Sequence, residues 1–337
     1  MTGARRNDFD VTNTVQVSSP HAVRAAVETL FRSTFPGVNL APVADAFDQF
    51  ERMFAGEVPG FYGSDTVYHD RQHTLDITLA LARLIVGYER QQESDDTRFG
   101  AERAVVGVLT GLFHDIGYLR RTEDGESRNG AEFTRTHVSR GARFIADYLP
   151  TVGLGAWVPI ATEIVHFTGY EVPFAQIKVS DPRDIKLGHL IGTADMIAQM
   201  ADRCYLEKCR DRLYAEFVLG GVALPMNGNG GNAPQVKYAS GLDLLRQTPD
   251  FVTEVRTKRL DGQFDRAYRY LEVLYGGSNP YIEAIDRNLE YLRQILRSEN
   301  WRLLRRNPPV FAAEPDTMTT TRTLMLGYIK KAWSAGS

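Results

Sequence analysis

Apolar residues recur along most of the chain at intervals of three and four, the spacing that places side chains on one face of a helix. In the segment 280–298 these residues are Ile282, Ile285, Leu289, Leu292 and Leu296. Proline, glycine and helix-capping residues divide the pattern into separate helices. The predicted helices span about residues 20–35, 41–54, 69–88, 101–117, 131–148, 157–167, 183–219 with room for a break, 240–247, 249–275 and 280–298.

The series contains no convincing pair of strands and no internal repeat, so the chain is predicted to be all-α. The clearest internal boundary is the segment 222–235, VALPMNGNGGNAPQ, which is too rich in glycine and asparagine for a helix interior. This segment is either a surface loop or a mobile flap near a functional site. The predicted organisation is an N-terminal extension (1–40), a main helical domain (41–220), a loop (221–240) and a C-terminal helical extension that packs on the core (241–337).

Composition and charge narrow the classes of partner. The chain has 337 residues, of which 43% are hydrophobic and 24% charged, as in ordinary globular proteins. With a net charge of −3, we do not expect a broad basic face for duplex nucleic acid. A phosphate ligand would therefore be held locally, by metal ions or by a few Arg and Lys side chains.

We expect a cytoplasmic protein that does not enter a membrane. The N-terminal sequence lacks the apolar segment of a signal peptide, and the longest apolar stretch, 104–113, is too short to cross a bilayer. Cys204 and Cys209 lie five residues apart on a predicted helix, so their side chains point in different directions. Both are expected to be reduced thiols, as is usual in the cytosol.

The histidines carry the strongest chemical signal. Only seven are present, and five of them fall into an ordered set with two aspartates: His69, His73, His114, Asp115, His137, His166 and Asp195. From His73 onward the members are separated by about one helix and one loop each. Successive helices of a bundle can therefore each contribute one ligand to a shared interior site. The two remaining histidines, His21 and His189, lie outside this set and are expected to be structural.

Three segments that carry members of this set have informative local surroundings. His69 and His73 are one helical turn apart, so both imidazoles can point into one pocket. His114 and Asp115 end an apolar helix in the sequence GLFHDIGY, which predicts a buried carboxylate. Such a group needs a partner or a metal, and imidazole with carboxylate suits divalent transition metals. Asp195 faces apolar neighbours in LGHLIGTADMIAQ in the same way.

This set resembles the H…HD…H…H…D signature of HD-superfamily metal enzymes, over about residues 62–210. YHDRQH is also similar to the YHNxxH segment of cyclic nucleotide phosphodiesterases. The resemblance implies an HD-domain helical bundle with additional C-terminal helices, in which 41–220 forms the catalytic domain. It implies two divalent transition-metal ions (Fe, Mn, Zn or Ni, with Mg as a candidate for the second site).

The same resemblance assigns roles to individual residues. His73, His114, Asp115 and Asp195 would bind one metal, while Asp115, His137 and His166 would bind the other. His69 would be the general acid. The match departs from both subfamilies at Asp70, where phosphodiesterases have Asn, and at Tyr118, where many HD hydrolases have Lys.

The expected function is hydrolysis of a phosphodiester or phosphomonoester of a nucleotide-like small molecule by a metal-activated hydroxide. Two alternatives stay open: an HD-type mixed-valent di-iron oxygenase, and a non-catalytic helical sensor that binds a nucleotide. A homodimer is compatible with the sequence. Asp70 would either orient His69 or, as we favour, be solvated. Three arginines lie near the motifs: Arg71, Arg120 and Arg121. We interpret them as exposed charges, and contact with a phosphate group is the less favoured alternative.

Overall fold

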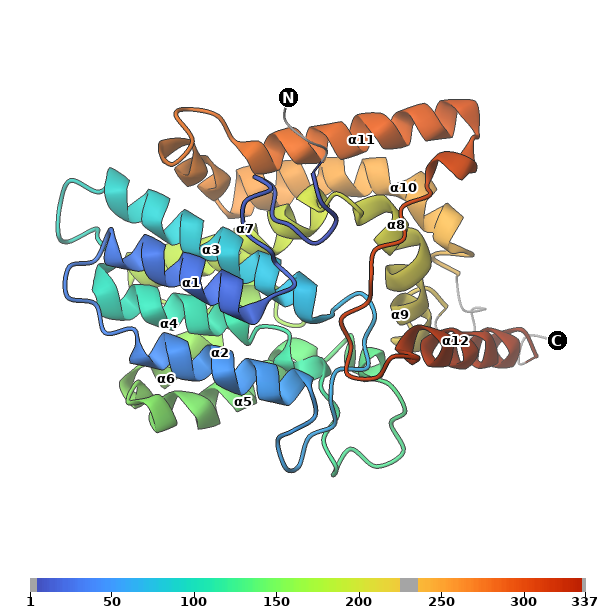
Figure 1. The fold of residues 1–337 in the computed structure, drawn as a ribbon, viewed down its shortest axis with the longest axis horizontal. Coiled ribbons are helices and arrows are strands. Elements are labelled where there is room, and N and C mark those ends of the chain that lie inside the picture. The colour runs from blue at the N-terminus through green and yellow to red at the C-terminus, as the bar shows by residue number, and fades with distance from the viewer. Residues whose placement is uncertain (1–4, 225–235, 335–337) are drawn as a thin grey trace.

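The computed structural model describes residues 5–224 and 236–334 (Figure 1). Extended pairing in these ranges is limited to two isolated β-bridges, between Phe9 and Gln16 and between Phe61 and Arg121, and this confirms the all-α prediction. The α-helices are α1 (Pro20–Arg32), α2 (Ala41–Phe54), α3 (Arg71–Gln91), α4 (Gly100–Leu112), α5 (His137–Tyr148), α6 (Val158–Ile164), α7 (Pro182–Ala201), α8 (Tyr205–Lys208), α9 (Tyr214–Leu219), α10 (Gly241–Glu254), α11 (Pro280–Ser298) and α12 (Thr317–Ser334).

Helices α3 and α7 form the centre of the molecule. Nearly every residue of α3 from Gln72 to Glu89 is buried, and α7 is buried along most of its length. A helix that is covered on all sides lies within a core rather than on a surface. The two helices pack against each other, and α3 also contacts α1 and α4. Polar side chains on α3 and α7 therefore face the protein interior.

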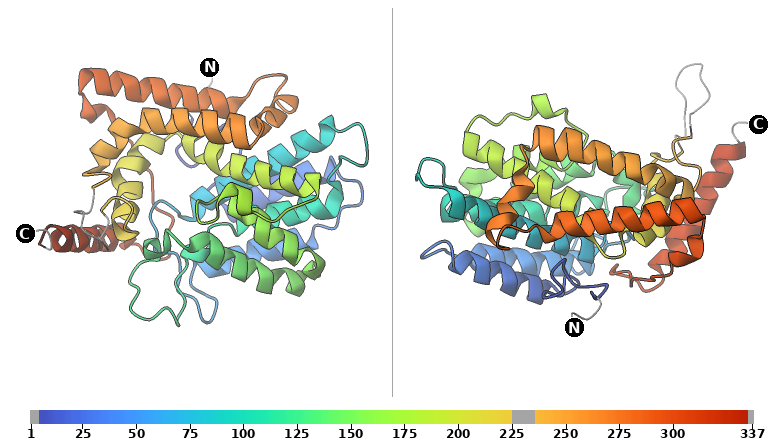
Figure 2. Two further views of the ribbon diagram at one scale, coloured as in Figure 1. Left: turned by 180° about the vertical axis from the view of Figure 1, so that it is seen from behind. Right: turned by 90° about the horizontal axis from the view of Figure 1, so that it is seen from above.

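The outer helices surround this pair. Helix α2 packs on both α1 and α4, and α5 packs on α6. Helices α10 and α11 run along the opposite edge, and α12 lies at the end near the C-terminus (Figures 1 and 2). One hydrophobic cluster includes Val17 from the N-terminal extension, Leu81 from α3 and Ile285 from α11. The segments 1–40 and 241–337 thus share a core with the segment 41–220.

Two predicted helices begin or end elsewhere. The helix expected from 131 begins at His137, because Asn129 caps a short 3₁₀ turn at 130–133 first. The helix expected over 183–219 ends at Ala201. There Asp202 leaves the helical conformation, and its side chain accepts a hydrogen bond from the Cys204 N–H at 2.8 Å. The chain continues through α8, a π-helical turn and α9.

The region after 240 also differs from the prediction. Helix α10 continues through Pro249, where a break was expected, so the helix forgoes one backbone hydrogen bond. The helix expected over 249–275 is divided instead. A π-helical segment ends at Gln263, and Asp265 and Arg266 take positive φ angles before a 3₁₀ helix begins. Helix α12, which packs on α9, was not anticipated.

Three other expectations concern membranes, cysteines and the glycine-rich loop. Within residues 5–224 and 236–334, no helix combines the length and hydrophobicity needed to cross a bilayer. Cys204 and Cys209 are buried free thiols, as expected. The predicted loop 222–235 lies outside the described residues from position 225 onward.

Candidate metal centre

The start of α3 holds His73 through a capping interaction. Asp70 is the N-cap residue, and its Oδ1 accepts a hydrogen bond from the His73 backbone N–H at 3.1 Å. Its Oδ2 accepts one from the Phe311 N–H at 3.1 Å and lies 3.6 Å from the Arg212 guanidinium. Asp70 is fully buried, so the prediction that it is solvated is wrong. The carboxylate instead ties the start of α3 to the C-terminal segment.

Asp115 lies at the centre of the candidate site, just beyond the end of α4. Its Oδ2 is 3.3 Å from Nε2 of His73 and 3.1 Å from Nε2 of His114. Its Oδ1 is 3.5 Å from Nε2 of His137. Three imidazoles from separate segments thus direct the same ring nitrogen at one buried carboxylate, as the ordered set led us to expect.

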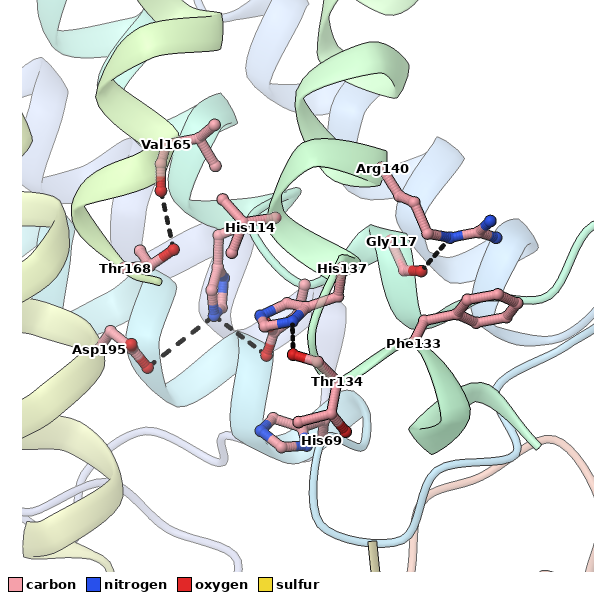
Figure 3. Close-up of polar contacts among 12 residues, drawn as sticks. His69, His114, Gly117, Phe133, Thr134, His137, Arg140, Val165, Thr168 and Asp195 are labelled. Carbon is pink, nitrogen blue, oxygen red and sulfur yellow. Dashed lines mark hydrogen bonds and ion pairs between the residues drawn. The ribbon is translucent and has the colours of Figure 1, made fainter. Parts of the chain in front are cut away.

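The turn after Asp115 brings α5 close to this carboxylate. A β-carbon at position 117 would overlap the carbonyl oxygen of His137, so only glycine permits this approach. Arg140 fastens the turn, because its Nε donates a hydrogen bond to the Gly117 carbonyl at 2.8 Å (Figure 3). Gly117, the glycine of HDIGY, therefore allows His137 to approach Asp115.

Backbone carbonyls hold two of the imidazoles in place. The Nδ1 atom of His114 lies 2.8 Å from the Gly111 carbonyl, and Nδ1 of His137 lies 2.9 Å from the Thr134 carbonyl. If each Nδ1 carries the proton, it donates to the carbonyl, and each Nε2 keeps its lone pair for the interior (Figure 3). Metal-binding histidines in proteins are usually oriented in this way.

Asp195 enters the site from α7. Its Oδ1 is 4.0 Å from Nε2 of His114 and accepts a hydrogen bond from Nε2 of Gln199 at 3.1 Å. The Tyr68 hydroxyl donates in turn to Oε1 of Gln199 at 3.0 Å. Burial raises the pKa of Asp195, which indicates a carboxylate that needs a nearby positive charge.

His69 is paired with a buried glutamate on α9. Its Nδ1 is 2.5 Å from Oε2 of Glu216, whose other oxygen accepts hydrogen bonds from the N–H groups of Val67 and Tyr68 at 2.7 and 2.6 Å. The His69 ring also stacks on Tyr118, with 4.4 Å between ring centroids. Burial alone would lower the pKa of His69, but the Glu216 carboxylate raises it.

His166 stands apart from the other predicted ligands. It lies in the short turn Val165–Phe167, and its Nδ1 is buried without a hydrogen-bond partner. Burial lowers its pKa. Within the described part of the chain, no hydrogen bond or ion pair joins it to the other five residues, so the structure brings five of the six predicted ligands into contact.

The donor set fits a divalent transition metal. Nε2 of His114 and Oδ2 of Asp115 are both buried and lie 3.1 Å apart as an ion pair, but neither atom takes part in a well-aligned hydrogen bond. Two overlapping groups, His69 with His73 and Asp115, and His73 with His114 and Asp195, each place their ligand atoms within 4.8 Å of one another. Burial disfavours the charged form of His114, yet the adjacent Asp115 carboxylate raises the pKa of His114 to about 9. The carboxylates therefore attract a positive charge to the point where a metal would sit.

Sequence reasoning missed three side chains that support the site. These are Glu216, Gln199 and Glu171, of which Glu171 accepts hydrogen bonds from the first N–H groups of α5 at Val138 and Ser139. Glu216 and Glu171 have partners far away in sequence, and Glu216 is 147 positions from His69, so no local pattern distinguishes them. Gln199 lies one helical turn after Asp195, but its second partner, Tyr68, is 131 positions away.

The three arginines near the motifs are not free charges. Arg120 is 2.6 Å from Asp65, and Arg121 is 3.4 Å from Glu123. About a fifth to a quarter of each of these two arginine side chains is exposed. Arg71 packs over the ring of Phe311. Their interpretation as exposed charges is therefore wrong for this fold.

The two histidines outside the set lie away from these contacts. His21 is exposed on α1. His189 on α7 is surrounded by the rings of Phe167, Phe174 and Phe264, whose centroids lie 5.6 to 5.8 Å away.

Comparison with known proteins adds no relative to this picture, since no family model, curated protein or solved structure matches the chain.

Proposed function

We propose that this protein is a metal-dependent phosphohydrolase that acts on a phosphodiester or phosphomonoester of a nucleotide-like molecule. The observation that carries the proposal is the convergence of His73, His114 and His137 on the buried Asp115, with the His69–Glu216 pair beside it. A purely structural cluster has no need to leave buried ring and carboxylate atoms without hydrogen-bond partners.

In this proposal His73, His114, Asp115 and Asp195 hold one divalent ion. Asp115 also contributes to a second ion, together with His137 and His166. Ligands of this kind favour Fe, Mn, Zn or Ni, with Mg as a candidate for the second position. Bound ions of this type lower the pKa of a coordinated water to about 7 and neutralise phosphate charge.

His69 supplies the proton that the leaving oxygen needs. Glu216 accepts the hydrogen bond from Nδ1–H, which fixes the ring and favours the imidazolium form. Nε2–H is then the proton that the ring can donate. Stacking on Tyr118 restricts rotation of the ring, so the proton keeps one direction. Because His69 also lies within ligand distance of His73 and Asp115, its role as an acid or as a ligand has to be tested separately.

The test is turnover by the purified chain supplied with Mn²⁺, Fe²⁺, Zn²⁺ or Ni²⁺. The substrates are phosphomonoesters, linear phosphodiesters and cyclic nucleotides. We expect metal-dependent hydrolysis of at least one class, lost in Asp115→Ala and retained in the control His21→Ala, whose side chain is exposed on α1.

Two other outcomes would contradict hydrolysis. Oxygen consumption by the iron-loaded protein without phosphate release would favour a di-iron oxygenase. Nucleotide binding without turnover under any metal would favour a sensor.

A further inference from the structure

A small polar cavity borders His73. Its volume is about 10 Å³, which is close to the space of a single water molecule. It is lined by Tyr68, Gln72, His73, Asp76, Gln199, Asp202, Tyr205 and Lys208. Asp115 does not line this cavity. Because Nε2 of His73 faces Asp115, Nδ1 is the ring nitrogen left for a contact on the cavity side.

Asp76 points an unsatisfied atom into this region. The residue is only 7% exposed, and its Oδ1 has no hydrogen-bond partner. Asp76 follows His73 by three positions on α3, so the two side chains share one face of the helix. Burial raises the pKa of Asp76 to about 7, so a hydrogen-bond donor at Oδ1 would help to keep the carboxylate ionised.

His73 is the exception among the histidines gathered at the site. Nδ1 is paired with Glu216 in His69, with the Gly111 carbonyl in His114, and with the Thr134 carbonyl in His137. In His73, Nε2 faces Asp115, and no described residue pairs with Nδ1. A metal-binding imidazole usually donates its second N–H to a carboxylate, a carbonyl or a water.

A cation is a poor occupant for the cavity, because the protein already places one there. The Lys208 ammonium lies 2.6 Å from Asp202 and donates to Oε1 of Gln72 at 3.2 Å. A second positive charge beside this buried ammonium would be repelled. A water molecule suits the space, since it can accept one hydrogen bond and donate another.

We propose that one ordered water in this cavity accepts a hydrogen bond from Nδ1–H of His73 and donates one to Oδ1 of Asp76. Asp76 is then a positioning residue that fixes the tautomer and orientation of His73. The effect on metal binding rests on the proposed metal centre, whereas the water bridge itself does not.

The first test is a high-resolution crystal structure of the wild-type protein. We expect a water within hydrogen-bond distance of both Nδ1 of His73 and Oδ1 of Asp76. A cavity without that water, or a water that contacts only one of the two atoms, overturns the bridge. This result does not depend on whether the protein binds metal or hydrolyses phosphate.

The second test is Mn²⁺ affinity measured by calorimetric titration. Asp76→Leu should weaken binding roughly 10- to 100-fold, and Asp76→Asn should weaken it less because the amide oxygen can still accept the bond. The control is Glu207→Gln, because Glu207 is another buried carboxylate with one oxygen that accepts no hydrogen bond, but it does not line the cavity. Thermal melting checks that each variant is folded.

The positioning role is overturned if wild type and folded Asp76→Leu bind Mn²⁺ with equal affinity. It is also overturned if Glu207→Gln loses as much Mn²⁺ affinity as Asp76→Leu. If Asp76→Leu does not fold, the same comparison is made with Asp76→Asn. A wild-type protein that binds no Mn²⁺ or other transition metal contradicts the proposed function instead.

Discussion

Replacing Glu216 with glutamine removes one charge and keeps nearly the same shape. Glu216 is fully buried and accepts hydrogen bonds from the backbone at Val67 and Tyr68 as well as from His69. The glutamine oxygen can keep the backbone contacts, but its amide cannot stabilise an imidazolium. A hydrogen bond to a charged group contributes about 1.5–3 kcal/mol. If this stabilisation is lost, the pKa of His69 falls and less of the imidazolium is present at neutral pH, so kcat falls by up to roughly 10- to 150-fold.

A double-mutant cycle separates this effect from structural damage. His69→Ala alone should lower kcat by roughly 10²–10⁴-fold. In the His69→Ala background, Glu216→Gln should cost little more, because the residue that it acts through is gone. The assay is steady-state hydrolysis of one substrate with a poor leaving group, such as a ribose hydroxyl, and one p-nitrophenyl ester. Both variants should lose much less activity on the p-nitrophenyl ester, since p-nitrophenolate departs without a proton.

Metal content is measured in every member of the cycle and should not change. The reasoning is refuted if Glu216→Gln lowers kcat as much in the His69→Ala background as in the wild type. In that case Glu216 acts through the backbone of Val67 and Tyr68. If His69→Ala loses metal and slows both substrates alike, His69 is a ligand and not the acid.

Three further outcomes are expected. Asp195→Ala should abolish hydrolysis while circular dichroism shows a folded protein, and full turnover in this variant would exclude Asp195 as a ligand. His137→Ala should lose mainly one of two ions by elemental analysis; loss of both, or of neither, would contradict its assignment to the second site. Burial opposes ionisation of Asp10, yet Arg83 and nearby N–H and O–H groups lower its pKa to about 2. Its carboxylate thus adds stability above about pH 4 that is lost as the pH falls through 2, so the unfolding free energy of wild type relative to Asp10→Asn should drop by about 2 kcal/mol between pH 5 and 2; a difference that does not change with pH would refute this.

The sequence was sufficient for the helical class and for much of the group of side chains that meet at the candidate site, for an identifiable reason. Apolar spacing marks each helix, and a charged or imidazole side chain inside an apolar stretch stands out from its neighbours. Asp115 in GLFHDIGY is the clearest example, and the structure buries it among three imidazoles. The convergence on Asp115 of His137, His73 and Asp195, which lie 22, 42 and 80 positions from it, then follows from the packing of α3, α4, α5 and α7.

The parts that were missed depend on contacts with no local signal. Asp70 resembles a solvated residue in sequence, but a C-terminal segment around Phe311 covers it. Glu216 looks like an ordinary polar position on a helix until the fold brings it to His69. Pro249 predicts a helix end from local rules alone, whereas packing keeps α10 continuous. Such tertiary effects override local preferences without leaving a mark in the nearby sequence.

The central claim is that the side chains around Asp115 hold two metal ions. Elemental analysis of the purified chain, after loading with Mn, Fe, Zn or Ni and removal of free metal, tests it most directly. We predict close to two ions per wild-type chain, and none in Asp115→Ala because this carboxylate is shared by both sites. A folded wild-type protein that retains no transition metal, or an Asp115→Ala variant that retains the full amount, would contradict the account.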